Sequence, residues 1–160
     1  MKQDVFNQPI SDVVSLFITD CKEKKRSQGT IDLYQAKLAA FVKFCCEYSI
    51  TKISEVTPLS IREFMIDLNK THTRGGTYTY VAVLRTFLIW IGRRCKSTFT
   101  NPIRNIRPPK KRFPMLTGIS LENIEKMINA CGHDIQGLRD KAIISALLQT
   151  GIRPNELCVL

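Results

Sequence analysis

The stretch TYTYVAVLRTFLIWIGRR, residues 77–94, decides the fold. Its apolar residues recur at intervals of three and four, which is the spacing of one face of an α-helix. We expect this buried stripe to consist of Tyr80, Val81, Leu84, Phe87, Leu88 and Ile91. Thr77, after the glycines at 75 and 76, is the predicted cap. Because Arg85 and Arg93 fall outside the stripe, the helix is predicted to bury one side and expose cations on the other.

Three further helices are predicted before this one. Apolar residues repeat at helical spacing in residues 11–21 and again from about Thr30 to Cys45. Thr57 followed by Pro58 is a cap with a first-turn proline, which opens a third helix. No segment alternates with the period of a β-strand. Four amphipathic helices joined by short polar segments predict a compact all-α bundle through about residue 95.

The composition changes after the bundle. Residues 101–114, NPIRNIRPPKKRFP, hold four prolines, five cations and no acid, which indicates a linker. Ser120 is the predicted cap of a following helix, and another begins at residues 136–139 with Gly151 as a left-handed end. The predicted organisation is a helical domain at 1–100, a basic linker at 101–117 and an incomplete domain at 118–160.

The excess of positive over negative charge is concentrated in one third of the chain. Residues 68–121, called the acid-free band below, contain eleven Lys and Arg and no Asp or Glu, whereas the rest holds 13 cations and 14 acids. This asymmetry is typical of a protein that binds a polyanion, above all double-stranded DNA. A solvated surface, an anionic membrane surface and an acidic protein are the alternatives. The candidate DNA contacts are Arg74, Thr77, Arg85, Arg93, Arg94, Lys96, Arg104, Arg107, Lys110, Lys111 and Arg112.

The sequence lacks the features of a membrane-spanning, secreted or metal-binding protein. No apolar run of about 18 residues indicates a membrane span, and no signal peptide is evident. The six cysteines include no C-x-x-C pair, so buried thiols in a reducing cytoplasm are expected. Cys131 and His133 alone make no metal site. We therefore expect no metal site and no membrane partner.

The segment GLRDKAIISALLQTGIRPNELCVL, residues 137–160, resembles the start of the catalytic domain in tyrosine recombinases, the phage integrase family. The similarity rests on the dipeptide Arg139-Asp140 and on the element Thr-Gly-x-Arg-x-x-Glu-Leu that begins at Thr150. Pro154 departs from the branched apolar residue common there. Upstream, the pattern of the family's core-binding domain is matched by Thr30, Tyr34, Leu38, Phe41, Phe44, Leu84, Phe87 and Asn101-Pro102.

The resemblance implies a SAM-like four-helix core-binding bundle, followed by the first helices of an α+β catalytic domain. It also implies that the whole protein cleaves and rejoins DNA strands through a 3′-phosphotyrosyl intermediate and needs no cofactor. The protomers would act together in a tetrameric synapse. DNA integration, as carried out by mobile elements, would be among the outcomes. Arg153 would be a catalytic phosphate ligand and Glu156 its support; a bare Arg153–Glu156 ion pair is the structural alternative.

In the family, the nucleophilic tyrosine and the other catalytic residues follow the first arginine. The tyrosines of this chain, Tyr34, Tyr48, Tyr78 and Tyr80, all precede Arg153. We therefore expect the chain to be the N-terminal part of a recombinase, able to bind DNA and inactive alone. A stand-alone helical DNA-binding or regulatory module, and a helical protein-interaction domain, remain open.

Overall fold

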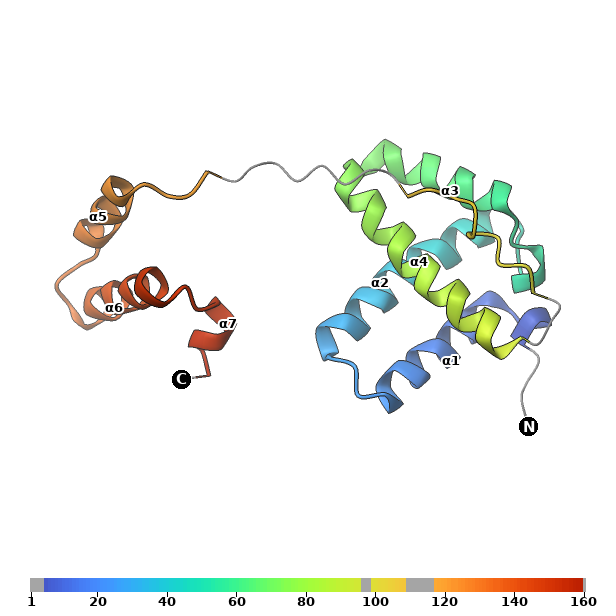
Figure 1. Cartoon of the computed structure of the whole chain (residues 1–160), viewed down its shortest axis with the longest axis horizontal. Coiled ribbons are helices and arrows are strands. Elements are labelled where there is room, and N and C mark those ends of the chain that lie inside the picture. The colour runs from blue at the N-terminus through green and yellow to red at the C-terminus, as the bar shows by residue number, and fades with distance from the viewer. Residues whose placement is uncertain (1–4, 96–98, 109–116, 160) are drawn as a thin grey trace. The chain divides into compact units, whose positions relative to one another are not determined.

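The computed structural model describes residues 5–95, 99–108 and 117–159, and the regular secondary structure in these ranges is helical (Figure 1). It divides into two compact units, residues 1–113 (unit 1) and 114–160 (unit 2). The predicted all-α class is confirmed for the described ranges, where the nearest approach to a sheet is one isolated bridge between Pro9 and Lys52. No helix in these ranges is long and apolar enough to cross a membrane.

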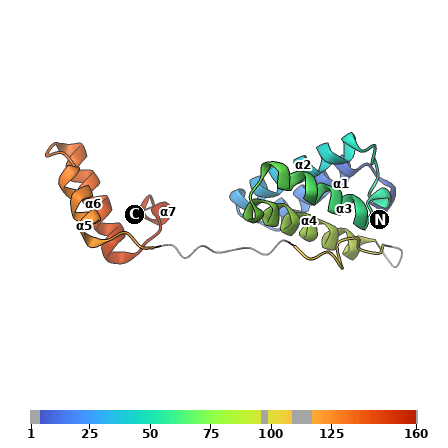
Figure 2. The same cartoon turned by 90° about the horizontal axis from the view of Figure 1, so that it is seen from above.

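Unit 1 is built from α1 (Ile10–Glu23), α2 (Gln28–Glu47), α3 (Pro58–Thr71) and α4 (Arg74–Arg94), with short 3₁₀ turns at Val5–Asn7 and Ile53–Glu55. α4 contacts each of the other three helices. Figure 2 shows α4 along one side of the unit, with α1, α2 and α3 beyond it. The four-helix bundle predicted from the apolar periodicity is therefore confirmed.

Aromatic rings hold the centre of this bundle together. The Phe17 ring of α1 lies 5.5 Å from the Tyr34 ring of α2, 5.4 Å from Phe87 and 5.3 Å from Trp90 of α4, measured between centroids. On the other side of the core, the Phe64 ring of α3 lies 5.2 Å from Phe41. Such offset and edge contacts add to the free energy of area burial. One continuous core thus fixes α4 against three helices.

The predicted cap at Thr57 is confirmed, because its hydroxyl accepts the amide hydrogen of Ser60. The predicted cap at Thr77 is wrong. α4 begins at Arg74 with Thr73 as its cap, and the glycines at 75 and 76 lie in the first helical turn. Thr77 is fully buried, and its hydroxyl donates to the Asn69 side chain of α3 at 2.9 Å. A threonine that bonds across a helix pair cannot also cap its own helix.

Residues 99–108, which include the first part of the predicted linker (101–108), fold back along unit 1 (Figure 1). Asn101 accepts the backbone N–H of Ile103 with its side-chain oxygen, which stabilises a turn over residues 102–105. Ile103 and Ile106 are 1% and 6% exposed, so each contributes about 1.5–3 kcal/mol of burial. The ring of Phe99 packs edge-on against Phe6. We call residues 99–108 the docked segment.

Unit 2 contains α5 (Leu121–Ala130), α6 (Ile135–Thr150) and α7 (Pro154–Leu157). The predicted cap Ser120 is confirmed, and Asp134 caps α6 by accepting the N–H of Gly137. Gly151 ends α6 with a φ of 64°, the predicted left-handed conformation. Large apolar side chains of this unit are exposed, among them Leu138 at 59% and Val159 at 86%. Part of the apolar surface of unit 2 is therefore uncovered among the described residues.

A carboxylate closes one end of unit 1. Asp20 of α1 accepts hydrogen bonds from Trp90 Nε1 at 2.9 Å, from Lys24 Nζ at 2.7 Å and from the Arg94 guanidinium. Burial alone would raise the pKa of Asp20, but the hydrogen bonds and charges of these partners outweigh it and hold the pKa below its usual 3.8. Asp20 thereby ties α1 to α4.

We predict that Asp20→Asn lowers the free energy of unfolding at pH 7 by about 1–2 kcal/mol, because the amide keeps an acceptor for Trp90 but loses the charge. Since the folded pKa lies below the unfolded one, the stabilisation is complete above the unfolded value of 3.8 and is lost as pH falls through the folded pKa. Urea unfolding at a series of pH values measures this. The gap between wild type and variant should close in acid, and a gap of the same size at every pH would contradict the prediction.

We also predict that Gly137→Ala loosens unit 2, because a Cβ there would lie 2.0 Å from the Gly132 carbonyl oxygen. Without this conflict, alanine would stabilise α6 by about 1 kcal/mol relative to glycine. We expect the free energy of unfolding of unit 2 to fall by about 1–3 kcal/mol, because the backbone must move to make room for the Cβ. Amide hydrogen exchange in α5 and α6 measures it. Gly118→Ala, where a Cβ meets nothing within 4 Å, is the control, and equal exchange in both variants would contradict the prediction.

Candidate nucleic-acid interface

α4 presents two different sides because its apolar residues occupy one arc of the helix. Thr77, Val81, Leu84, Leu88 and Ile91 fall on the buried arc. The opposite arc carries Arg74, Arg85 and Arg93, with Ile89 also exposed. A rise of 1.5 Å per residue places these arginines about 16 and 12 Å apart along the helix axis. The second arc is therefore a line of cations on a rigid support.

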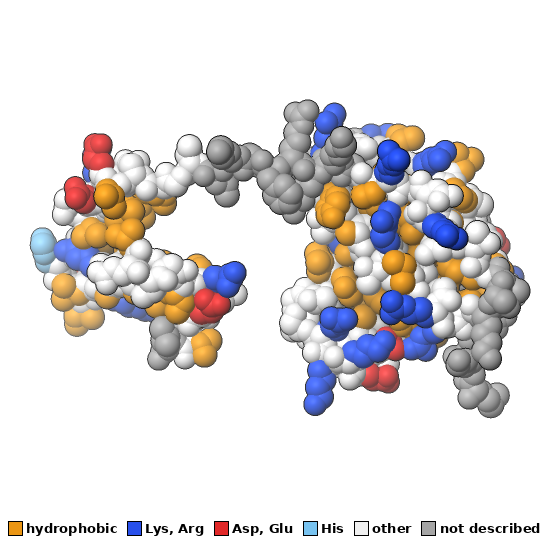
Figure 3. All heavy atoms as spheres, viewed as in Figure 1, with side chains coloured by type: hydrophobic (Ala, Val, Ile, Leu, Met, Phe, Trp, Pro, Cys, Tyr) orange, Lys and Arg blue, Asp and Glu red, His pale blue; other side chains and the backbone are white. Residues whose placement is uncertain are grey.

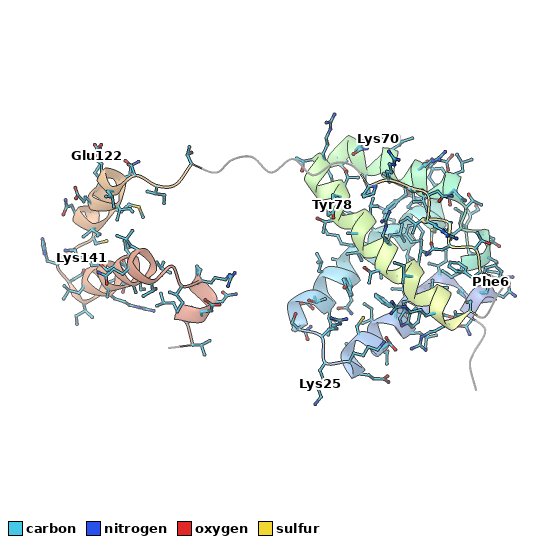
Figure 4. The ribbon with its side chains drawn as sticks, in the orientation of Figure 1. Phe6, Lys25, Lys70, Tyr78, Glu122 and Lys141 are labelled. Atoms are coloured by element: carbon cyan, nitrogen blue, oxygen red, sulfur yellow. The ribbon has the colours of Figure 1, made fainter. Side chains whose placement is uncertain are left out.

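The same side of unit 1 is basic over a wider area. Figure 3 shows Lys and Arg side chains spread over the face on which α4 lies, with few Asp or Glu side chains among them. Lys70 and Lys25 lie toward opposite ends of this face, and Tyr78 lies on α4 between them (Figure 4). The fold thus joins the acid-free band to cations from the α1–α2 turn.

The predicted contacts divide into exposed and engaged side chains. Arg74 and Arg93 on α4, and Arg104 and Arg107 on the docked segment, are exposed. Arg85 is half-buried and donates from Nη2 to the carbonyl oxygen of Ile106 at 2.7 Å. The exposed set keeps its guanidinium groups accessible to a ligand, whereas Arg85 already joins α4 to the docked segment.

Two other predicted contacts have structural partners. Arg94 pairs with Asp20, and its guanidinium lies 4.3 Å from the centre of the Trp90 ring. Thr77 is buried, so its hydroxyl faces the core and we leave it out of the interface. The other predicted cations, Lys96, Lys110, Lys111 and Arg112, lie outside the described residues.

Sequence reasoning missed two cations that the fold brings to this surface. Arg62 of α3 lines a hollow of about 590 Å³ together with Arg104. Arg26, just after α1, lines one of about 280 Å³ with Arg93 and the Trp90 ring. Both precede the acid-free band and lie near acids in the sequence, so the charge distribution along the chain did not indicate them. The available signal for Arg62 was its place on the face of α3 opposite Ile61, Phe64 and Leu68.

Arg153 occupies a separate site in unit 2, immediately before α7. Its backbone is extended, with φ −75° and ψ 148°, and Pro154 takes the first helical position. Glu156 accepts the Arg153 backbone N–H at 3.0 Å and contacts Nη1 at 3.3 Å. The Arg153 side chain is 84% exposed, and an ion pair this open contributes little to stability. The geometry leaves the guanidinium accessible to an anion.

Comparison with known proteins places this architecture. Residues 14–94, which run from α1 to the end of α4, match the family described as phage integrase, N-terminal SAM-like domain. The chain belongs to the phage integrase family of tyrosine recombinases. No solved structure gives a significant match.

Relatives of this recombinase family extend the similarity beyond the bundle. The chain is 33% identical over 137 residues to tyrosine recombinase XerC of Natranaerobius thermophilus, covering 84% of this chain and 46% of the relative. It is 30% identical over 169 aligned positions to tyrosine recombinase XerA of Saccharolobus solfataricus, covering 98% and 53%. The XerC of Actinobacillus pleuropneumoniae is 26% identical, with 84% and 44% covered. The chain spans about half the length of these recombinases.

Proposed function

We propose that this chain is the DNA-binding portion of a site-specific tyrosine recombinase, and that unit 1 holds duplex DNA against α4 and the docked segment. The observation that carries the proposal is the exposed arc of α4 with Arg74 and Arg93, beside Arg104 and Arg107. These cations lie in the acid-free band of a chain from a recombinase family. Duplex DNA is the polyanion whose phosphates such a line of cations fits.

Cations of this kind position a protein on DNA more than they read its sequence. α4 carries Arg74 near its start and Arg93 near its end, both exposed and about 28 Å apart along the helix axis. We infer that α4 lies at or across a groove and that Arg74 and Arg93 contact phosphates on the rims. Exposed Ile89 falls between them on the same arc, where an apolar contact with a base is accessible.

We infer that Arg153 acts on the scissile phosphate. In the reaction proposed for the whole recombinase, a tyrosine hydroxyl attacks phosphorus, the P–O bond to the 5′ oxygen breaks, and that oxygen leaves as a hydroxyl. One phosphodiester replaces another, so the step needs no cofactor. Negative charge grows on the non-bridging oxygens in the transition state, and a guanidinium held in place stabilises it. Glu156 would hold the Arg153 backbone and one guanidinium nitrogen.

The reaction partners follow from the same proposal. Recombination joins two duplexes, each cut on both strands, so four protomers in one synapse with double-stranded DNA are the expected assembly. The α+β character of the remaining catalytic domain belongs to this proposal. The alternative is a helical DNA-binding or regulatory module without catalysis, which shares the basic surface but gives Arg153 no role in the chemistry.

We predict that the chain binds duplex DNA with a steep salt dependence. If about six phosphates are neutralised, the slope of log K against log salt concentration should be near −5. Fluorescence anisotropy at several salt concentrations measures it. Reversal of Lys110, Lys111 and Arg112 to Glu should flatten the slope and weaken unrelated sequences equally, since these cations are expected to contact phosphate. Affinity independent of salt, or no duplex binding at low salt, would remove the DNA-binding proposal.

We predict that Arg153→Lys, in a chain extended to the length of the recombinase relatives, leaves duplex affinity almost unchanged but slows covalent complex formation. The lysine keeps the charge and loses the two-pronged contact with phosphate oxygens. The expected loss is about 10²-fold or more, the scale of removing one preorganised donor. A suicide substrate that traps the phosphotyrosyl intermediate, at saturating DNA, measures it. Trapping at the wild-type rate would make Arg153 a structural partner of Glu156 and favour the non-catalytic module.

A further inference from the structure

Four arginines of unit 1 lie on or next to the docked segment. Two belong to the segment, one to α3 and one to α4. Arg62 of α3 shares a hollow of about 590 Å³ with Arg104 and another of about 470 Å³ with Arg107. Arg85 of α4 shares a third, of about 480 Å³, with both Arg104 and Arg107. Asn105 and Ile106 line all three hollows, so the four side chains ring one short stretch of chain. We call these four residues the arginine cluster.

The charge of the arginine cluster is not balanced by neighbours. Among the described residues, none of its four guanidinium groups forms a salt bridge with a carboxylate, whereas Arg94 pairs with Asp20 and Lys70 with Asp67. Like charges gathered in one place repel one another, and the repulsion is relieved when an anion binds. The surface is therefore suited to a ligand with more than one negative charge.

The backbone that carries Arg104 and Arg107 is held in place. Ile103 and Ile106 are buried on either side of Arg104, and Ile106 donates its N–H to the Ile103 carbonyl at 3.1 Å. Arg85 fixes the same residue by donating to the Ile106 carbonyl. Because the segment is already ordered, less conformational entropy is lost when its arginines close on a ligand.

We propose that Arg62, Arg104 and Arg107 form a preorganised phosphate-binding site that takes backbone phosphates of duplex DNA, and that Arg85 is a positioning residue for it. The identity of the ligand as duplex DNA rests on the proposed function. Arginine suits this role because its planar fork contacts two phosphate oxygens at once. The site extends the interface onto α3, outside the acid-free band, and assigns Arg62 a contact that no motif indicates.

The first test uses inorganic pyrophosphate, which needs no DNA. The arginine Nε–H signals of the ¹⁵N-labelled chain are followed during titration and assigned with single variants. The expected result is that the signals of Arg62, Arg104 and Arg107 shift together. Arg62→Gln and, independently, Arg104→Gln should each weaken pyrophosphate binding about tenfold, the scale of a charge-assisted contact. Lys43→Gln, an exposed cation of α2 that lines none of the three hollows, should leave the affinity unchanged.

The second test uses duplex DNA with the same variants. Arg62→Gln should reduce the salt slope by about 1 and weaken all sequences alike, while Arg62→Lys should keep the slope because it keeps the charge. If Arg62→Gln binds both pyrophosphate and duplex as wild type does, the site is overturned and the DNA-binding proposal stands. If the cluster binds pyrophosphate while the chain fails to bind duplex at low salt, the DNA-binding proposal falls and the anion site stands without DNA as its ligand.

The third test separates the role of Arg85 from that of a ligand. Arg85→Met keeps an unbranched side chain and removes the donor to Ile106. The expected result is faster amide exchange at Ile106, together with weaker pyrophosphate binding and an unchanged thermal unfolding midpoint of the bundle. Weaker binding with unchanged exchange would make Arg85 a phosphate ligand and overturn its positioning role.

Discussion

The division of α4 into a buried arc and an exposed arc is the constraint on which the rest of unit 1 depends. Its inner side chains contact α1, α2 and α3 at once, so the rotation of α4 about its own axis is fixed by packing on three sides. Rotating α4 far enough to turn Arg74 or Arg93 inward would bury a charge and expose Leu84 or Phe87, both of which are unfavourable. The basic face is therefore a consequence of the core.

Asp20 and the docked segment add two further attachments to α4 and the bundle. The carboxylate of Asp20 binds Trp90 and Arg94 near the end of α4, while Ile103 and Ile106 pack on the unit after the chain has reversed. One consequence is that cations near each other in sequence have different roles. Arg93 is exposed and Arg94 is tied to an acid, because successive residues of a helix point about 100° apart.

Local sequence signals predicted much of this fold. The apolar periodicity identified α1 to α4, and Thr57-Pro58, Ser120 and Gly151 marked helix ends through interactions that involve only neighbouring residues. The errors came from contacts between distant residues. Thr77 is read as a cap from its position after two glycines, but its partner Asn69 lies on another helix. The prolines and cations of residues 101–114 indicate a linker. Nothing in the neighbouring sequence shows that the side chains of Ile103 and Ile106 pack into the core of unit 1.

The hydrogen bond between Arg85 and Ile106 has a mechanical meaning. A force applied to the chain at Pro108 is resisted first by Ile106 and Ile103, which are wedged into the core, and by the guanidinium that links Ile106 to the middle of α4. The last turn of α4, where the helix ends at Arg94, is thereby shielded from the load. Tension at Pro108 therefore acts on the buried isoleucines and on the middle of α4 before it reaches the end of that helix.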